Sequence, residues 1–422
     1  MRRWRHDPFF PPLGTRTFEP FAGAGVTLLD LPSRHDEDWR WSDLSALPDI
    51  AGRKPAGAVP DALPWIDAPG PRLLFVDGRL AAERSSPGPV VIGPVDRHDE
   101  DHALARLAGA EGWVLRLDSG DVSIGLVQIV HVSTGAADHL PARIALGAGA
   151  EASILETFLG DGWINRLASI TLDKGARLML ARRLLGGGGF VSLADRAVVG
   201  EGASLIATTL AAGGSDTRID GRLLLAGESA FAEVGGALLA RGRQRHDANL
   251  VLRHAAPGGT SRQLWRSVAD DLAACSVAAR VEVARGAQKT DGEQSLKGLL
   301  LSRTATINAK PELEIFADDV KCAHGATVGE LDRDVLFYMA SRGVPEAEAK
   351  ALLTRAFVAD AIERIGEEAV RKALERDVEE WFAKAPPLEG EGLGRGGVSG
   401  GDAAQMTSPP PPKPSPLKGE GF

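Results

Sequence analysis

The sequence contains very few cysteines and aromatic residues. Cys275 and Cys322 are the two cysteines among 422 residues, too few for a disulfide framework, so a reducing compartment fits the chain. There is one tyrosine, and aromatic residues make up 5% of the chain. The charged first residues are not followed by an apolar stretch, so we expect no signal peptide, and no run is long enough for a membrane span. We therefore expect a cytoplasmic protein without a membrane partner.

Basic clusters and nucleotide-binding fingerprints are also missing from the sequence. The chain has 57 acidic and 48 basic residues, a net charge of −9, and no basic block, so we expect no nucleic-acid partner. The glycine run at residues 186–189 is not followed by the Lys and Ser/Thr that a phosphate-binding loop requires. We interpret it as a corner between strands. Any ATP chemistry must therefore belong to a partner protein.

An internal repeat is the strongest pattern in the sequence, which contains 50 glycines. Similar segments are separated by 26, 27, 26, 27, 31 and 26 residues and begin at Ile144, Ile170, Ala197, Leu223, Leu250, Val281 and Ile307. Each segment contains two short runs in which apolar residues alternate with other residues, joined by a turn that is often Gly-Ala. This period indicates a solenoid, and the alternation indicates strands. We predict a mainly β fold whose core, residues 140–330, is a right-handed parallel β-helix.

The longer step before Val281 predicts an insertion between coils around residues 265–275. Cys275 lies at its end among Ala and Leu, and we interpret it as an ordinary buried cysteine.

The N-terminal region, residues 1–139, is expected to combine short elements with irregular linkers. Acidic residues before Trp39 and Trp41 predict a short surface helix that the tryptophans anchor. Residues 73–80 predict a strand and turn, and residues 98–108 a short helix.

After residue 331 the apolar period becomes helical, which predicts a C-terminal helical domain over residues 331–384. Asp332 or Asp334 can cap a first helix through Ser341, and Pro345 opens the next one. A third helix carries an apolar stripe of Val370, Leu374, Val378 and Trp381. Residues 385–422 are rich in Gly and Pro and are expected to be disordered.

Cys322 and His324 are the candidate metal-ligating residues. Two residues apart in a predicted strand, they point to one face, whereas Lys321 and Ala323 point to the other. Thiolate and imidazole suit iron, zinc or iron–sulfur chemistry. The pair alone is only half of a site, and a histidine packed at the rim of a solenoid is the structural alternative.

The segment from Pro311 to Asp332, followed by Ser341–Gly343, closely resembles the signature of the SufD family of the SUF iron–sulfur cluster assembly system. Residues 31–44 also resemble the E-x-W-x-x-T/S stretch near the start of that family. Two departures occur: Ala323 replaces a more usual Ser, and Lys297-Gly298 replaces Arg-Asn or Lys-Asn. The resemblance implies a β-helix core between an N-terminal region and a C-terminal helical domain.

The resemblance also implies partners and site residues. The chain would pair with a SufB-type β-helix subunit and bind a SufC-type ATPase through its helical domain, with Tyr338, Arg342 and Gly343 as candidate contacts. His324, with Cys322 beside it, would take part in nascent cluster assembly at the SufB interface, both as tentative metal ligands. The implied cofactor is a transient iron–sulfur cluster at that interface, with none tightly bound to the isolated chain. The chain would be a scaffold subunit and not an enzyme.

Two alternatives come from other classes. Parallel β-helices also include polysaccharide lyases and hydrolases, which need paired carboxylates near aromatic platforms. Here Asp318 and Asp319 are adjacent, so in a strand they face opposite ways, and aromatic residues are sparse. A stand-alone zinc or iron enzyme would need more clustered ligands than the sequence offers.

Overall fold

The computed structural model describes residues 31–95 and 102–384, apart from the side chain of Ile124, and the following statements concern these residues. The expected disordered tail, residues 385–422, and the start of the helix expected at 98–108 lie outside this part of the chain.

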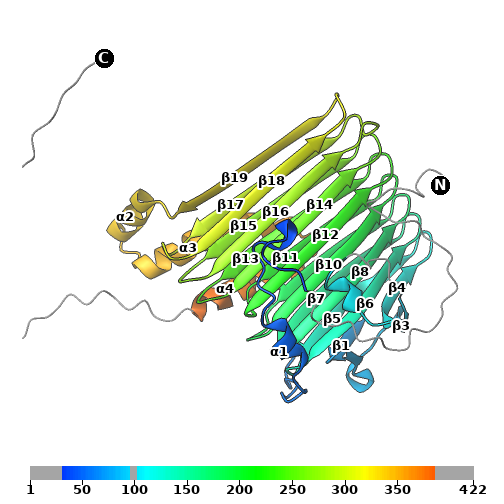
Figure 1. The fold of residues 1–422 in the computed structure, drawn as a ribbon, viewed down its shortest axis with the longest axis horizontal. Helices are drawn as coiled ribbons and strands as arrows, with labels where there is room; N and C mark the ends of the chain where they lie inside the picture. Colours follow the sequence, from blue (N-terminus) through cyan, green and yellow to red (C-terminus); the bar gives the residue numbers. More distant parts are fainter. Residues whose placement is uncertain (1–30, 96–101, 385–422) are drawn as a thin grey trace, which may run out of the picture. The chain divides into compact units, whose positions relative to one another are not determined.

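Two sheets dominate the described chain, and successive strands alternate between them as coils of a parallel β-solenoid (Figure 1). This confirms the predicted mainly β solenoid. The first sheet, with 10 strands, has the spatial order β19 (Lys321–Glu330), β17 (Asp291–Leu300), β15 (Thr260–Ala269), β13 (Phe231–Ala240), β11 (Ser204–Ala211), β9 (Arg177–Leu184), β7 (Glu151–Gly160), β5 (Val122–Ser133), β1 (Arg72–Val76) and β2 (Arg79–Leu80). The second sheet, with 9 strands, has the order β18 (Thr306–Ile315), β16 (Ala274–Val283), β14 (Arg245–His254), β12 (Asp216–Leu225), β10 (Phe190–Val199), β8 (Trp163–Leu172), β6 (Ala137–Leu146), β4 (Glu111–Leu117) and β3 (Val90–Pro94).

The strand register confirms the first part of the predicted repeat and corrects the rest. Ile144, Ile170, Ala197 and Leu223 are neighbours in register, as predicted. Leu223 then pairs with Leu252 instead of Leu250. Similarly, Val281 pairs with Leu313 instead of Ile307.

The later coils are longer, which explains the shifted register. Strand β11 has 8 residues, whereas β13 has 10, and the corners after β14 and β16 also lengthen. The insertion expected at residues 265–275 is therefore wrong, because those residues end β15, turn, and begin β16.

The sheets begin upstream of the start expected at residue 140. Strand β1 pairs in parallel with β5, and β5 with β7, so they add to the first sheet. The register of β5 shifts between Val122 and Leu126, which interrupts the repeat and hides it from the sequence pattern. The strand and turn predicted at 73–80 correspond to β1, the turn at Asp77 and β2.

The core between the two sheets is mostly apolar and contains one cluster of charged side chains. Arg166 lies in register between the core residues Leu140 and Leu193. Its Nε is 3.0 Å from Glu156 Oε1, and Arg182 Nε is 3.1 Å from Glu156 Oε2. Burial pushes the pKa of Glu156 upward, but Arg166, His131 and Arg182 outweigh it and hold the pKa at about 2. Glu156 is thus ionised and paired inside the solenoid.

Segments from the N-terminal region cover the outer face of the 9-stranded sheet. They contain η2 (Glu37–Trp39), α1 (Leu47–Ala51) and η4 (Ala105–Leu107), whereas η3 (Ala82–Arg84) lies beside β1 of the 10-stranded sheet. The guanidinium of Arg218 stacks 4.2 Å from the centre of the Trp39 ring, and Ser42 donates a hydrogen bond to Asp247. The segment predicted from its tryptophans is therefore anchored to the sheet, whereas the described part of the helix expected at 98–108, residues 102–108, contains only η4.

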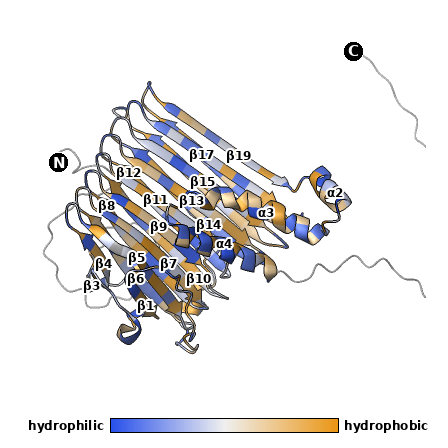
Figure 2. Cartoon of the chain, turned by 180° about the vertical axis from the view of Figure 1, so that it is seen from behind, coloured by the Kyte–Doolittle hydropathy of each residue, from blue (hydrophilic) through white to orange (hydrophobic). Residues whose placement is uncertain are grey.

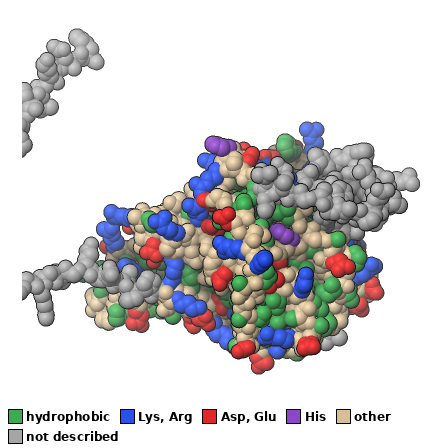
Figure 3. Space-filling model, turned by 60° about the horizontal axis from the view of Figure 1, so that its bottom comes forward, with side chains coloured by type: hydrophobic (Ala, Val, Ile, Leu, Met, Phe, Trp, Pro, Cys, Tyr) green, Lys and Arg blue, Asp and Glu red, His purple; other side chains and the backbone are tan. Residues whose placement is uncertain are grey.

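Helices α3 (Glu346–Ile362) and α4 (Glu368–Ala383) lie across the outer face of the 10-stranded sheet (Figure 2). The predicted stripe of α4 is buried there, with Val370 and Leu374 in one apolar cluster with Leu239 and Val268 of the sheet. Helix α2 (Arg333–Ser341) precedes them and buries none of its side chains. No helix in the described ranges is both long and apolar enough to cross a membrane. Figure 3 shows Lys and Arg side chains interspersed with Asp and Glu over one face.

Candidate functional site at the open end of the solenoid

The solenoid ends in two neighbouring strands, β18 and β19, each of which has a free edge in the described structure. Lys321 N donates to the O atom of Thr290, the residue before β17, and Thr306 N donates to the O atom of Ala273, the residue before β16. Because backbone groups alternate along a strand, the N–H groups of Cys322 and His324 point to the free edge. On β18 the same alternation places Pro311, which has no N–H, at the middle of the free edge.

Cys322 points into the end of the solenoid. Its side chain is half-buried and packs with Val281 and Val283. Its sulfur is also next to Gly292. A Cβ added at Gly292 would be 3.4 Å from Cys322 Sγ and 3.5 Å from Ser261 Oγ. Burial raises the pKa of the Cys322 thiol, so the isolated chain carries a protonated thiol at neutral pH. This environment differs from that of an activated nucleophilic cysteine.

His324 lies on the same strand and is exposed. Its register partner on β17 is Gln294, and within the described residues it makes no side-chain hydrogen bond. A Cβ added at the following Gly325, which faces the opposite side of the strand, would meet no atom within 4 Å. The strand period places Cys322 and His324 on one face, and no strand of the described residues lies beyond β19.

The described chain offers an incomplete metal site. Across residues 31–95 and 102–384, no group of three or more His, Cys, Asp or Glu is arranged to hold a metal ion. Iron–sulfur clusters and zinc sites normally take four protein ligands, and catalytic zinc sites take three. Cys322 and His324 can therefore act as ligands only if another molecule supplies the rest.

The other predicted residues gather at the opposite end of β19. Asp332 caps α2 by accepting hydrogen bonds from the Asp334 and Val335 amides. Tyr338 is 59% exposed, and the Arg342 guanidinium lies 5.3 Å from its ring centre. Gly343 follows the helix with φ +86°, the left-handed conformation expected at this position. The eight strand residues that follow Cys322 in β19 separate it from this cluster by roughly 26 Å.

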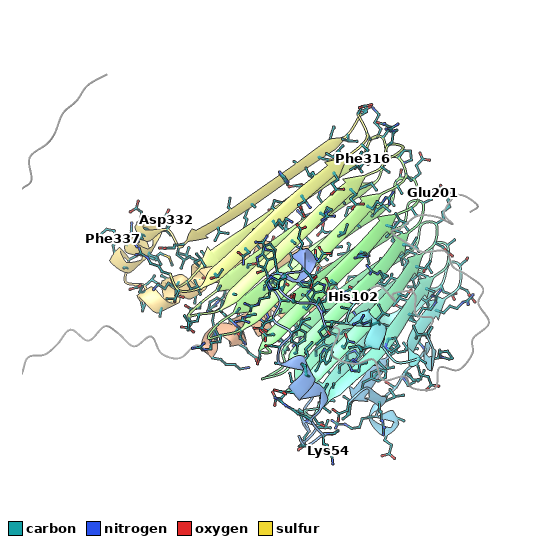
Figure 4. All side chains as sticks on the ribbon, viewed as in Figure 1. Lys54, His102, Glu201, Phe316, Asp332 and Phe337 are labelled. Carbon is teal, nitrogen blue, oxygen red and sulfur yellow. The ribbon has the colours of Figure 1, made fainter. Side chains whose placement is uncertain are left out.

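Two exposed aromatic residues were not among the predicted site residues. Phe337 on α2 is 77% exposed, and Phe316, in the turn between β18 and β19, is 63% exposed (Figure 4). The sequence signal that could have identified Phe337 was its place beside Tyr338, a predicted site residue. The structure adds that their helix has no buried side chains. Figure 4 shows Phe316 and Phe337 at opposite ends of the open edge of the solenoid.

Cys275 takes no part in this site. It is fully buried, and its Sγ lies 3.7 Å from Leu238 O and 3.6 Å from Val268 O. Burial raises the pKa of its thiol. The prediction of an ordinary buried cysteine is confirmed.

Comparisons with known proteins agree with this architecture. Residues 131–357 match the SufBD core domain, described as SUF system FeS cluster assembly. The iron–sulfur cluster assembly protein SufD of Escherichia coli is 27% identical over 404 residues, which cover 89% of this chain and 95% of that protein. Bacillus subtilis SufD is 30% identical over 159 residues, 38% of this chain and 36% of its own. A SufBD family protein of Synechocystis is 37% identical over 138 residues, 33% of this chain and 30% of its own.

Proposed function

The chain belongs to the SufBD core family of SUF iron–sulfur cluster assembly proteins, and on that premise we propose that it is the SufD-like subunit of a scaffold complex. Its proposed partners are a SufB-type β-solenoid subunit and a SufC-type ATPase, in the cytoplasm, with no part for nucleic acid or membrane. The subunit itself catalyses no reaction, and ATP hydrolysis occurs on the SufC-type partner.

The observation that carries the proposal is the pair of free edge strands, β18 and β19, with Cys322 and His324 on one of them. An exposed edge presents backbone donors and acceptors that another strand can pair with. A SufB-type partner is proposed to dock there by adding its own edge strands. Such docking would cover the exposed His324 and bring further ligands to the face that it shares with Cys322.

The cluster is treated as cargo that forms at this interface. A neutral imidazole and a thiolate are the ligand forms, so Cys322 must lose its proton when iron binds. Because burial raises the pKa of this thiol, the loss is unfavourable in the isolated chain. The arrangement supports assembly only after the partner has completed the site.

The SufC-type ATPase is proposed to dock on α2. Phe337, Tyr338 and Arg342 provide an exposed aromatic and cationic surface. Only Leu331 and Asp332 separate the end of β19 from the start of α2. Movement of the docked ATPase would thus be transmitted directly to the strand that carries His324.

The test uses His324→Ala in the complex co-purified with its SufB-type and SufC-type partners. We expect the variant complex to form and to hydrolyse ATP, while its iron and sulfide content falls sharply. Lys321→Ala is the matched control, because Lys321 is on the same strand with its side chain on the opposite face. Cys322→Ala is expected to have a smaller effect than His324→Ala.

A His324→Ala complex with normal iron and sulfide content would contradict the proposed role of His324. Failure of the complex to assemble would instead support a structural role at the solenoid rim. The family match argues against polysaccharide cleavage, the alternative that the fold class had left open.

A further inference from the structure

A row of polar side chains runs inward from His324. Gln263 of β15 pairs in register with Gln294 of β17, which pairs with His324 of β19. Side chains at paired positions of parallel strands lie on the same face of the sheet, here the face that contains the core residue Leu296. Both glutamines are only 1% exposed. The row therefore starts inside the solenoid and ends at the exposed imidazole.

Each glutamine reaches across to the opposite sheet. Gln294 Nε2 donates to Ala279 O at 2.8 Å, and Gln263 Nε2 donates to Arg280 O at 3.2 Å. A carbonyl oxygen can only accept, so the NH₂ group of each amide must face it and the amide oxygen must point elsewhere. Neither Oε1 has a hydrogen-bond donor in the described structure. Buried acceptors without a donor are rare in folded proteins.

Of the two glutamines, only Gln294 has His324 as its neighbour. Adjacent strands are about 4.8 Å apart, so an imidazole on β19 can reach the amide of Gln294. His324 Nδ1 and Nε2 make no hydrogen bond to the described residues, and no described strand lies beyond β19 to hold the ring in place. In the isolated chain the two groups are not bonded. A change in the side-chain torsions of His324 would bring a ring N–H to Gln294 Oε1.

We propose that Gln294 is a positioning residue for His324. When a partner strand covers β19, the imidazole turns inward and donates one ring N–H to Gln294 Oε1. The other ring nitrogen then keeps its lone pair for iron. Outer hydrogen-bond partners have this effect on metal-binding histidines, because they fix both the tautomer and the ring orientation. This inference rests on the function proposed for His324 and identifies the residue that sets its tautomer.

Gln294→Leu and Gln263→Leu are a matched pair for the test. Both remove a buried amide and one hydrogen bond to β16, but only the first removes a neighbour of His324. The measurement is the ¹⁵N spectrum of the full chain, labelled at histidine and bound to its unlabelled SufB-type partner. Subtracting the spectrum of His324→Gln assigns the His324 signals. We expect one dominant tautomer in the wild type and in Gln263→Leu, and a mixture in Gln294→Leu.

The iron affinity of the complex provides a second readout, which should fall about tenfold in Gln294→Leu. Gln294→Glu keeps an acceptor oxygen in place and is expected to retain the single tautomer. If the leucine variant does not fold, Gln294→Met replaces it, because methionine fills irregular space without an amide.

Equal tautomer ratios in the Gln294 and Gln263 variants would overturn the proposal, as would a mixture in Gln294→Glu. The tautomer ratio tests the role of Gln294, whereas the iron and sulfide content of the His324→Ala complex tests the proposed function. Failure of one is therefore distinguishable from failure of the other.

Discussion

Arg183 of β9 and Asp377 of α4 form a bidentate ion pair, with Nε–Oδ2 and Nη2–Oδ1 distances of 2.6 and 2.7 Å. Both side chains are almost fully buried. Arg183 also donates to Pro64 O at 2.9 Å, so one guanidinium joins the solenoid to a C-terminal helix and an N-terminal segment. The pair fixes α4 on the sheet.

Asp377→Ala should therefore destabilise the helical region. It leaves the buried Arg183 guanidinium without its carboxylate, which costs about 3–5 kcal/mol of the free energy of unfolding. Chemical denaturation measures this cost, and hydrogen exchange should show faster opening of α4. Glu368→Ala is the control, because it removes an exposed ion pair with Lys372 on the same helix and should leave the stability nearly unchanged. Equal stability of the two variants would refute this assignment.

Asp138 should make the protein less stable as the pH rises. Burial, and secondly the negative charge of Asp77, raise the pKa of this carboxyl to about 8. Its pKa in the unfolded chain is about 4. The folded state therefore binds more protons between these values, and the free energy of unfolding falls as pH rises from about 4 to about 8.

Asp138→Asn should remove this dependence and raise the free energy of unfolding at pH 8 by a few kcal/mol, since each pKa unit corresponds to about 1.4 kcal/mol. Denaturation curves measured at several pH values test the prediction. A wild-type stability that does not fall over this pH range, or that falls equally in the variant, would contradict it.

Phe337→Ala should weaken binding of the SufC-type ATPase without unfolding the chain. The side chain is exposed on a helix that buries none of its side chains, whereas an aromatic hot spot of an interface contributes about 2 kcal/mol or more to binding. We expect about 30-fold weaker binding by titration calorimetry. Phe316→Ala removes another exposed phenylalanine, at the other end of the open edge, and should leave ATPase binding intact. Loss of binding in both variants would indicate a general effect and not docking at α2.

Truncation after residue 385 should leave the melting temperature and complex formation unchanged. The removed segment is rich in Pro and Gly and has too few apolar residues to offset the entropy of ordering. Thermal unfolding and co-elution with the partners are the measurements. A clear drop in either would show that the segment contributes contacts that its composition does not reveal.

The repeat was predictable where each coil keeps the same length. From Ile144 to Leu223, small corners recur at steps of 26 or 27 residues, and the register agrees. The error at Leu250 arose because β13 has two residues more than β11, and the error at Ile307 arose because the coil from β16 to β18 is lengthened, mainly at the corner after β16. An apolar pattern of period two cannot reveal either change. A strand shifted by an even number of residues keeps the same faces inward, so the sequence pattern tolerates the wrong register.

The candidate site was predictable only in part. Strand periodicity is sufficient to place Cys322 and His324 on one face, and a capping aspartate and a glycine mark the ends of α2. Gln294 was not predictable as a neighbour, since its pairing with His324 depends on a coil of 30 residues closing in register. The unpaired amide oxygen of Gln294 depends on which backbone carbonyl the amide meets across the core, and the sequence carries no signal for that contact.

Pro311 limits how far such a solenoid can extend. A partner strand that pairs along β18 meets no N–H at the middle position of the edge, whereas β19 offers an uninterrupted series of N–H groups. Identical chains stacking end to end would lose a backbone hydrogen bond at every junction in the same sheet. Proline on an exposed edge is a recognised barrier to unlimited strand addition. The open end is thus suited to a single matched partner and disfavours growth into a fibre.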